Sequence, residues 1–137
     1  MTFRAPDADH PLFGPYWQPA RAGHLNLPSC TRCQTVLWPP TELCPECLCD
    51  EVHWSEQPGD GVVWSTAEYH RAYSPALAEE VPYTCVLVQL DCGPRLIARV
   101  AKQSDVVNPG DRVGVVRETT PTGQSVPCFA SSVWSSR

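Results

Sequence analysis

Two short stretches decide the fold, Cys30-Thr-Arg-Cys33 and Cys44-Pro-Glu-Cys47, and ten residues separate them. Each C-x-x-C pair lets two thiolates hold one ion from a single turn, and two such turns complete a tetrahedral four-sulfur site. The spacing therefore predicts a metal centre whose ligands are Cys30, Cys33, Cys44 and Cys47. Cys49 is the alternative fourth ligand, and Cys47 is preferred because it belongs to the better-formed turn.

Zinc and iron both accept four sulfur ligands, so the residues around the cysteines have to distinguish them. Rubredoxin-like iron sites usually carry a glycine after the second cysteine of each pair, where the backbone takes a positive φ. Gln34 and Leu48 stand at these positions here. A left-handed leucine costs on the order of 1 kcal/mol or more. We therefore expect a structural Zn2+ with no open coordination position. The alternative is a rubredoxin-like electron-transfer protein, which would be red in its ferric form.

Composition narrows the class of protein. The chain has 137 residues, 42% of them apolar, and 15 prolines that favour short strands over long helices. Its net charge of −5, with 10 basic against 15 acidic residues, disfavours nucleic acid as a partner, although OB-fold modules and zinc ribbons do bind it. The sequence shows neither a secretion signal nor an apolar run long enough for a membrane span. We expect a cytoplasmic protein with no membrane partner. Its eight cysteines indicate metal binding in preference to disulfide bonds.

The segment before the cysteines predicts an arm over residues 1–10 and one or two short helical turns over residues 11–23. Phe13, Tyr16 and Trp17 give this segment an aromatic face that is too large for so short a helix to bury by itself. Two interpretations remain open, packing on the ribbon and docking into a partner protein.

Beyond the turn cluster at residues 57–61 the pattern changes to strands. Five strands that close a small barrel after a metal ribbon predict an OB-like fold. The expected fold is mainly β: a short N-terminal helix, a rubredoxin-like zinc ribbon and a five-stranded OB-fold barrel. The expected domains are residues 1–27, 28–57 and 58–137. The expected barrel strands are residues 62–73, 83–91, 95–101, 112–118 and 125–130.

The order of several motifs carries a family resemblance. They are Pro15-Tyr16-Trp17, the first C-x-x-C, Leu37-Trp38-Pro39-Pro40, Cys44-Pro-Glu-Cys47, Tyr69-His70-Arg71, Val81-Pro82-Tyr83 and Gly93-Pro94-Arg95. This order resembles the zinc-ribbon/OB-fold family of acyl-CoA-associated proteins, long catalogued as a domain of unknown function. The resemblance covers about residues 11–130, and Trp38-Pro39-Pro40 is its most specific part.

The resemblance implies a non-catalytic accessory subunit. Such proteins bind a thiolase-fold enzyme that acts on acyl-CoA, namely a thiolase, an aldolase or an acyltransferase. The partner supplies the nucleophilic chemistry, and the accessory subunit helps to form the channel for a shared CoA thioester ligand. Because thiolase-fold enzymes are dimers, a heterotetramer is the expected assembly.

The residues themselves agree with a chain that is not catalytic alone. None of the familiar nucleophile, metalloprotease or nucleotide-binding motifs is present in the sequence. Cys85, Cys92 and Cys128 lie in apolar contexts, and we expect them to be core thiols. His70 is either a solvated strand-end histidine or part of a partner surface, on which Arg71 would pair with a CoA phosphate. The residues predicted to face the partner or CoA are Phe13, Tyr16, Trp17, Tyr69, His70, Arg71, Pro82 and Tyr83.

Overall fold

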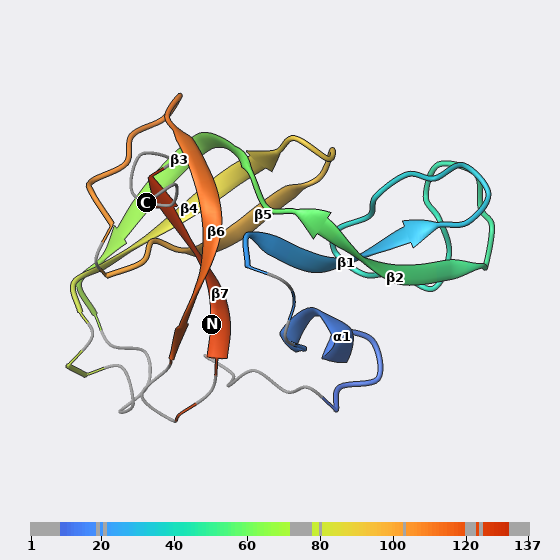
Figure 1. The fold of residues 1–137 in the computed structure, drawn as a ribbon, viewed down its shortest axis with the longest axis horizontal. Coiled ribbons are helices and arrows are strands. Elements are labelled where there is room, and N and C mark those ends of the chain that lie inside the picture. The colour runs from blue at the N-terminus through green and yellow to red at the C-terminus, as the bar shows by residue number, and fades with distance from the viewer. Residues whose placement is uncertain are drawn as a thin grey trace.

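The computed structural model describes residues 9–18, 20, 22–71, 78–79, 81–102, 104–119, 123 and 125–131. One short helix precedes a two-stranded hairpin and a five-stranded sheet. Figure 1 shows the hairpin projecting to one side of the barrel, with the helix beneath it. The elements are α1 (Gly14–Trp17), β1 (His24–Cys30), β2 (Val52–Pro58), β3 (Gly61–Tyr69), β4 (Tyr83–Leu90), β5 (Arg95–Arg99), β6 (Arg112–Thr119) and β7 (Ser125–Ser131).

The five-stranded sheet has the order β5-β4-β3-β6-β7, with antiparallel neighbours throughout. The two edge strands then approach each other. Val100, just after β5, forms a parallel bridge to Phe129 of β7, and the amide of Ala101 donates a 2.7 Å hydrogen bond to the Phe129 carbonyl. This nearly closes the sheet into a barrel with OB-fold strand order, which confirms the predicted architecture.

Two elements differ from the sequence expectation. β1 was not predicted as a strand, yet it pairs with all of β2, from His24 opposite Pro58 to Cys30 opposite Val52. Its start at His24 places the expected domain boundary at residue 28 inside a strand. The helix has four residues, about one turn, within the one or two short turns expected over residues 11–23. β3 ends at Tyr69 rather than at residue 73, and residues 72–77 lie outside the described part of the chain.

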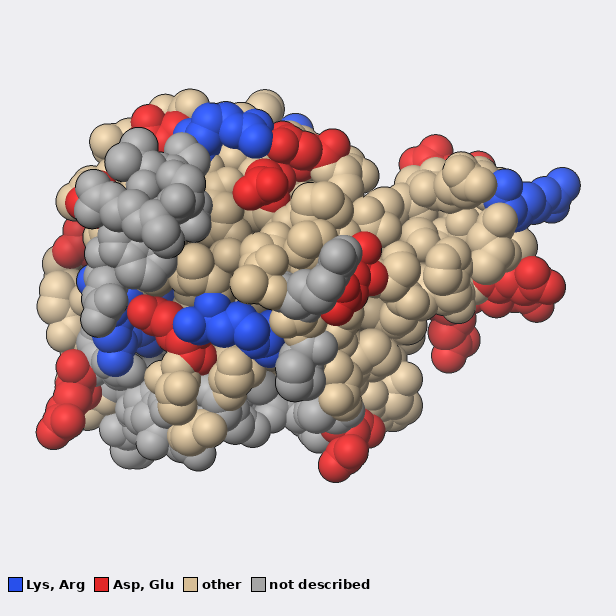
Figure 2. All heavy atoms as spheres, in the orientation of Figure 1, with Lys and Arg blue, Asp and Glu red and all other residues tan. Residues whose placement is uncertain are grey.

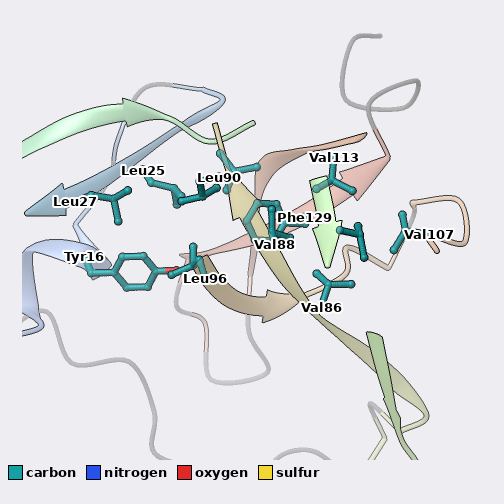
Figure 3. Close-up of a cluster of buried hydrophobic side chains, with 12 residues drawn as sticks. Tyr16, Leu25, Leu27, Val86, Val88, Leu90, Leu96, Val107, Val113 and Phe129 are labelled. Carbon is teal, nitrogen blue, oxygen red and sulfur yellow. The ribbon is translucent and has the colours of Figure 1, made fainter. Parts of the chain in front are cut away.

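One hydrophobic core joins the helix, the lower half of the hairpin and the barrel. Tyr16 of α1 and Leu25 and Leu27 of β1 are all at most 4% exposed and pack in the same cluster as the barrel interior. Figure 3 shows these three side chains next to Leu90 and Leu96. The barrel members of this cluster are Val63, Val86, Val88, Leu90, Leu96, Val107, Val113, Val115 and Phe129.

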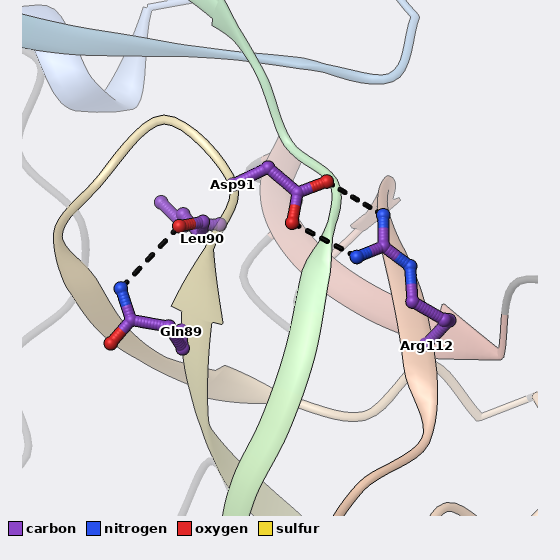
Figure 4. A network of polar contacts seen from close by, with 4 residues as sticks. All are labelled: Gln89, Leu90, Asp91 and Arg112. Atoms are coloured by element: carbon purple, nitrogen blue, oxygen red, sulfur yellow. Dashed lines mark hydrogen bonds and ion pairs between the residues drawn. The ribbon is translucent and has the colours of Figure 1, made fainter.

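The junction between hairpin and barrel leaves no room for side chains. A Cβ on Gly59 would collide with the side chain of Val115, and a Cβ on Gly61 would collide with the carbonyl of Gln89. Close by, Arg112 at the start of β6 donates two hydrogen bonds to the Asp91 carboxylate, of 2.9 and 2.6 Å (Figure 4). This bidentate pair ties the end of β4 to β6.

Candidate metal centre and partner-facing residues

Two matching turns build the metal centre. In the first, the amide of Gln34 donates a 2.9 Å hydrogen bond to the carbonyl of Cys30. In the second, the amide of Leu48 donates a 2.8 Å bond to the carbonyl of Cys44. Gln34 has a φ of 62° and Leu48 a φ of 61°. Both turns thus adopt the left-handed conformation that the cysteine spacing demands, although neither position carries the usual glycine.

The turns bring the four predicted thiols together. All four sulfur atoms lie within 4.8 Å of one another. The Sγ atoms of Cys30 and Cys47 are 3.5 Å apart, and those of Cys33 and Cys44 are 3.6 Å apart. A tetrahedral zinc with Zn–S bonds of about 2.3 Å separates its sulfurs by about 3.8 Å. The thiol cluster therefore fits a zinc ion, with all four coordination positions filled by protein.

Backbone and hydroxyl groups favour the thiolate form of Cys30 and Cys33, whereas burial and the neighbouring thiols raise the pKa of Cys47 to about 12. The backbone amide of Cys33 is the main cause that lowers the pKa of the Cys30 thiol to about 6. The Thr35 hydroxyl lies 3.1 Å from the Cys33 sulfur and lowers the pKa of that thiol. Because zinc binds the deprotonated thiol, these groups prepare Cys30 and Cys33 as ligands. When bound, the ion supplies a structural crosslink.

Cys49 is not part of the four-sulfur group. Its sulfur accepts a 3.4 Å hydrogen bond from the amide of Glu51, and the residue packs at the edge of the small ribbon cluster. Cys47 occupies the fourth position, as the sequence preferred.

The remaining thiols are poor nucleophiles. Burial is the main cause that raises the pKa of Cys128 to about 12, and it also raises the pKa values of Cys85 and Cys92. A reactive thiol needs a lowered pKa and access to solvent. These three cysteines therefore behave as packing residues.

The helix aromatics pack mainly on the ribbon. The Tyr16 ring lies 4.5 Å from the Trp38 ring and 4.7 Å from the Trp17 ring, and Phe13 meets Trp38 edge-on at 6.0 Å. Tyr16 is 4% exposed, so its placement among the partner-facing residues is corrected: its ring is already covered by this chain. Phe13 and Trp17 are half-buried and keep some accessible surface.

The predicted residues at the end of β3 and the start of β4 meet. The rings of Tyr69 and Tyr83 stack at 5.3 Å with an interplanar angle of 16°. The Arg99 guanidinium lies 5.1 Å from the centre of the Tyr83 ring. Sequence reasoning missed Arg99 because its position depends on the register of β4 with β5.

The other predicted residues here are exposed. The exposed His70 ring lies with its Nε2 atom 3.4 Å from the Glu68 carboxylate, and Arg71 and Pro82 are also on the surface. Most of residues 74–82, between the expected strands 62–73 and 83–91, lies outside the described residues.

An open groove of about 470 Å³ runs between the ribbon and the β4–β5 turn. Trp38 and Pro39 line its ribbon side, and Gly93 and Pro94 line its barrel side. Figure 2 shows the surface in the orientation of Figure 1, where the ribbon is mostly uncharged except toward its far end. In the described part of the chain no helix has the length and apolar character needed to cross a membrane.

The fold and the thiol cluster define the chain as a zinc-ribbon protein with an OB-fold barrel. Two family models match it in order: the rubredoxin-like zinc ribbon domain of ChsH2 over residues 17–53, and the C-terminal OB-fold domain of ChsH2 over residues 54–118. The chain belongs to this ChsH2-type zinc-ribbon/OB-fold family, and the four clustered cysteines, which could hold a metal ion, lie in its zinc ribbon.

Two individual proteins are also similar to the chain. A curated protein described as a probable enoyl-CoA hydratase alpha subunit, from Thermomonospora curvata, is 32% identical over 85 residues, which are 62% of this chain and 26% of the relative. The chain thus spans about a quarter of that relative's length. A solved chain described as the Ltp2-ChsH2(DUF35) aldolase is similar with a TM-score of 0.69 and 28% identity, over 80% of this chain and 85% of that chain.

Proposed function

We propose that this chain is a non-catalytic subunit that binds a thiolase-fold enzyme acting on acyl-CoA and helps to form its substrate channel. The observation that carries the proposal is the similarity to a chain of the Ltp2-ChsH2(DUF35) aldolase, which extends over most of both chains. The CoA thioester is then a ligand shared with the partner, and a heterotetramer is the expected assembly. Such a subunit would work in the cytoplasm, where reduced thiols are available to hold zinc.

The chemistry of the described residues supports an accessory role. The thiol cluster offers four protein ligands to one ion and leaves no position for a substrate. Burial raises the pKa of each thiol in the barrel strands and turns, so none of them is activated as a nucleophile. A reaction of acyl-CoA in the complex would therefore use groups of the partner.

A second candidate is a subunit of an enoyl-CoA hydratase. The relative from Thermomonospora curvata favours it, because that protein is described as a hydratase alpha subunit. Both candidates place the chain beside an enzyme of acyl-CoA metabolism, and they differ in the fold and reaction of the partner.

Co-expression tests both candidates. The tagged chain is expressed with each thiolase-fold and each hydratase protein encoded in its genomic neighbourhood, and the eluates are analysed by size-exclusion chromatography with light scattering. We expect a stable complex with a thiolase-fold protein, and aldol cleavage, thiolysis or acyl transfer by that complex but not by this chain alone. A complex only with a hydratase would favour the second candidate. Turnover by the isolated chain would contradict both.

A further inference from the structure

We propose that the outer face of strands β3, β4 and β5 is the docking surface for the partner subunit, and that it receives an acidic side chain flanked by apolar groups. This inference rests on the proposed function and adds which surface is used and what chemistry it recognises. It concerns residues that are distinct from the zinc centre and mostly absent from the sequence-based partner set.

The strand registers define this face. Val63, Val88 and Leu96 lie opposite one another and point into the core, so the residues between them in each strand point outward. The outward row at the middle of the sheet is Ser65, Leu87 and Ile97. The complete outer sheet face consists of Val62, Trp64, Ser65, Ala67, Tyr69, Tyr83, Cys85, Leu87, Gln89, Arg95, Ile97 and Arg99.

Large apolar side chains are exposed on this face. A bulge in β3 between Val63 and Ser65 inserts Trp64 as an extra residue, and bulges commonly re-aim a side chain. Trp64 is 56% exposed and Ile97 is 68% exposed. Both rank among the most exposed large hydrophobic residues that the structure describes, and they flank the same part of the sheet.

Contacts with Trp64 and Gln89 fix the Arg95 guanidinium in a position where it can bind an anion. Its guanidinium lies 4.1 Å from the centre of the Trp64 ring, and its Nε donates a 3.0 Å hydrogen bond to Oε1 of Gln89. Gln89 is itself fixed, because its Nε2 donates a 2.6 Å hydrogen bond to the carbonyl of Gly93. No carboxylate of the described residues pairs with Arg95. The two terminal nitrogens thus form a fixed fork suited to bidentate binding of a carboxylate.

At the far end of the face a second arginine lies beside aromatic rings. Tyr69 and Tyr83 stack on each other, and the Arg99 guanidinium lies over Tyr83. Arg95 and Arg99 are four residues apart on β5, so the two cations are separated by about 13 Å along the strand. The apolar side chains of Leu87 and Ile97 lie between them. Tryptophan, tyrosine and arginine are the residues that most often dominate binding at protein interfaces.

The charges of the outer sheet face favour a different protein with acidic groups as the one that binds there. The outer sheet face contains two arginines and no aspartate or glutamate. Two copies of this chain would bring Arg95, which pairs with no carboxylate of the described residues, against a face that offers none, and this disfavours a homodimer through this face. Single-stranded nucleic acid needs a groove with cations along several phosphates, and two isolated arginines do not provide one. An acidic and apolar surface of a protein partner fits best.

The experiment compares variants of the outer sheet face with controls elsewhere in the co-expressed complex. We expect Trp64→Ala and Arg95→Gln each to raise the dissociation constant of the complex about 30-fold, measured by isothermal titration calorimetry. Raising the salt concentration should weaken the wild-type complex more than the Arg95→Gln complex, because the variant lacks the ion pair. Matched controls are Val106→Ala, which removes an 85% exposed apolar side chain, and Arg32→Gln on the ribbon. Circular dichroism and zinc content verify that every variant is folded.

The outcomes separate the two proposals. Wild-type affinity in both Trp64→Ala and Arg95→Gln, with a wild-type complex that forms normally, would overturn the docking surface and leave the proposed function standing. Absence of any complex with the wild-type chain would overturn the proposed function and the docking surface with it. Binding of a fluorescent oligothymidine that is lost in Trp64→Ala would also overturn the inference, because it would assign the face to nucleic acid.

Discussion

The ribbon and the barrel of this chain are stabilised in different ways. The outer half of the ribbon has three buried residues in its own cluster, Cys30, Leu37 and Cys44, and two of them belong to the four-thiol cluster. The barrel has a continuous core around Phe129, which is 0% exposed. A two-stranded hairpin is marginally stable at best in water, so the ribbon depends on zinc where the barrel depends on packing.

The helix and part of β1 lie beside the ribbon in sequence but are stabilised by the barrel core. Tyr16, Leu25 and Leu27 belong to the barrel core although they lie next to the ribbon in sequence. The lower half of the hairpin is therefore stabilised by the barrel, and only the cysteine turns depend on the ion. Loss of zinc should loosen the turns and leave the barrel intact.

The largest effect is expected from Cys44→Ser. Structural zinc binds zinc-finger peptides with an apparent free energy of about 10–16 kcal/mol, and loss of one thiolate removes much of this energy. Elemental analysis should find about one zinc in the wild type and much less in the variant. Amide hydrogen exchange should show lost protection in residues 30–50 and retained protection in β4 and β6. Cys49→Ser is the matched control and should keep its zinc. Loss of zinc in Cys49→Ser, and not in Cys47→Ser, would contradict the ligand assignment.

A cavity in the barrel core should destabilise the barrel and leave zinc binding in native buffer unchanged. Among the described residues, Phe129 has the largest fully buried side chain, and Phe129→Ala should lower the free energy of unfolding by about 3–5 kcal/mol. Urea unfolding followed by circular dichroism measures this loss, and zinc content in native buffer should remain at about one per chain. The exposed Val106→Ala serves as control. Simultaneous release of zinc and unfolding of the barrel at every urea concentration would show that the two regions form one cooperative unit.

A smaller effect is expected from Leu48→Gly. The wild-type leucine has a φ of 61° and is 74% exposed, so glycine relieves backbone strain of about 1 kcal/mol or more and loses little burial. The greater freedom of glycine in the unfolded chain offsets part of this gain. We expect zinc affinity to rise by up to about 1 kcal/mol, measured by competition with a chromophoric chelator. Leu43→Gly, at an exposed position without positive φ, should not raise it. Weaker zinc binding in Leu48→Gly would show that the side chain supports the turn.

The smallest effect concerns the Asp91–Arg112 pair on the barrel. The hydrogen bonds from Arg112 lower the pKa of Asp91, and both side chains are about half exposed, so the pair contributes at most about 1 kcal/mol. Because the pKa is lowered in the folded state, this stability is present above about pH 4, the unfolded value, and is lost as pH falls through the folded value. Asp91→Asn should therefore be less stable than the wild type at pH 7, and the two should converge toward pH 3. Urea titrations at both pH values measure the difference. A difference that persists at low pH would assign the effect to packing.

Local patterns in the sequence predict much of this protein. The cysteine spacing predicted that Cys30, Cys33, Cys44 and Cys47 come together, because the cluster is built from two turns that each involve a few neighbouring residues. Strand alternation and turn residues predicted the five barrel strands, since both signals act over short distances. The motif order also identified the family.

What only the tertiary structure decided depends on contacts between distant segments. The sequence left open whether Tyr16 faces a partner, and the structure places it in the core because Trp38 and the barrel cover it. The strand β1 forms through pairing with β2, more than twenty residues away, so its own short pattern gave little signal. The grouping of Trp64 with Arg95, and of Tyr83 with Arg99, required the register of β3, β4 and β5 and the bulge at Trp64. Register is a property of paired strands, and for that reason the outer sheet face could not be found by reading the chain alone.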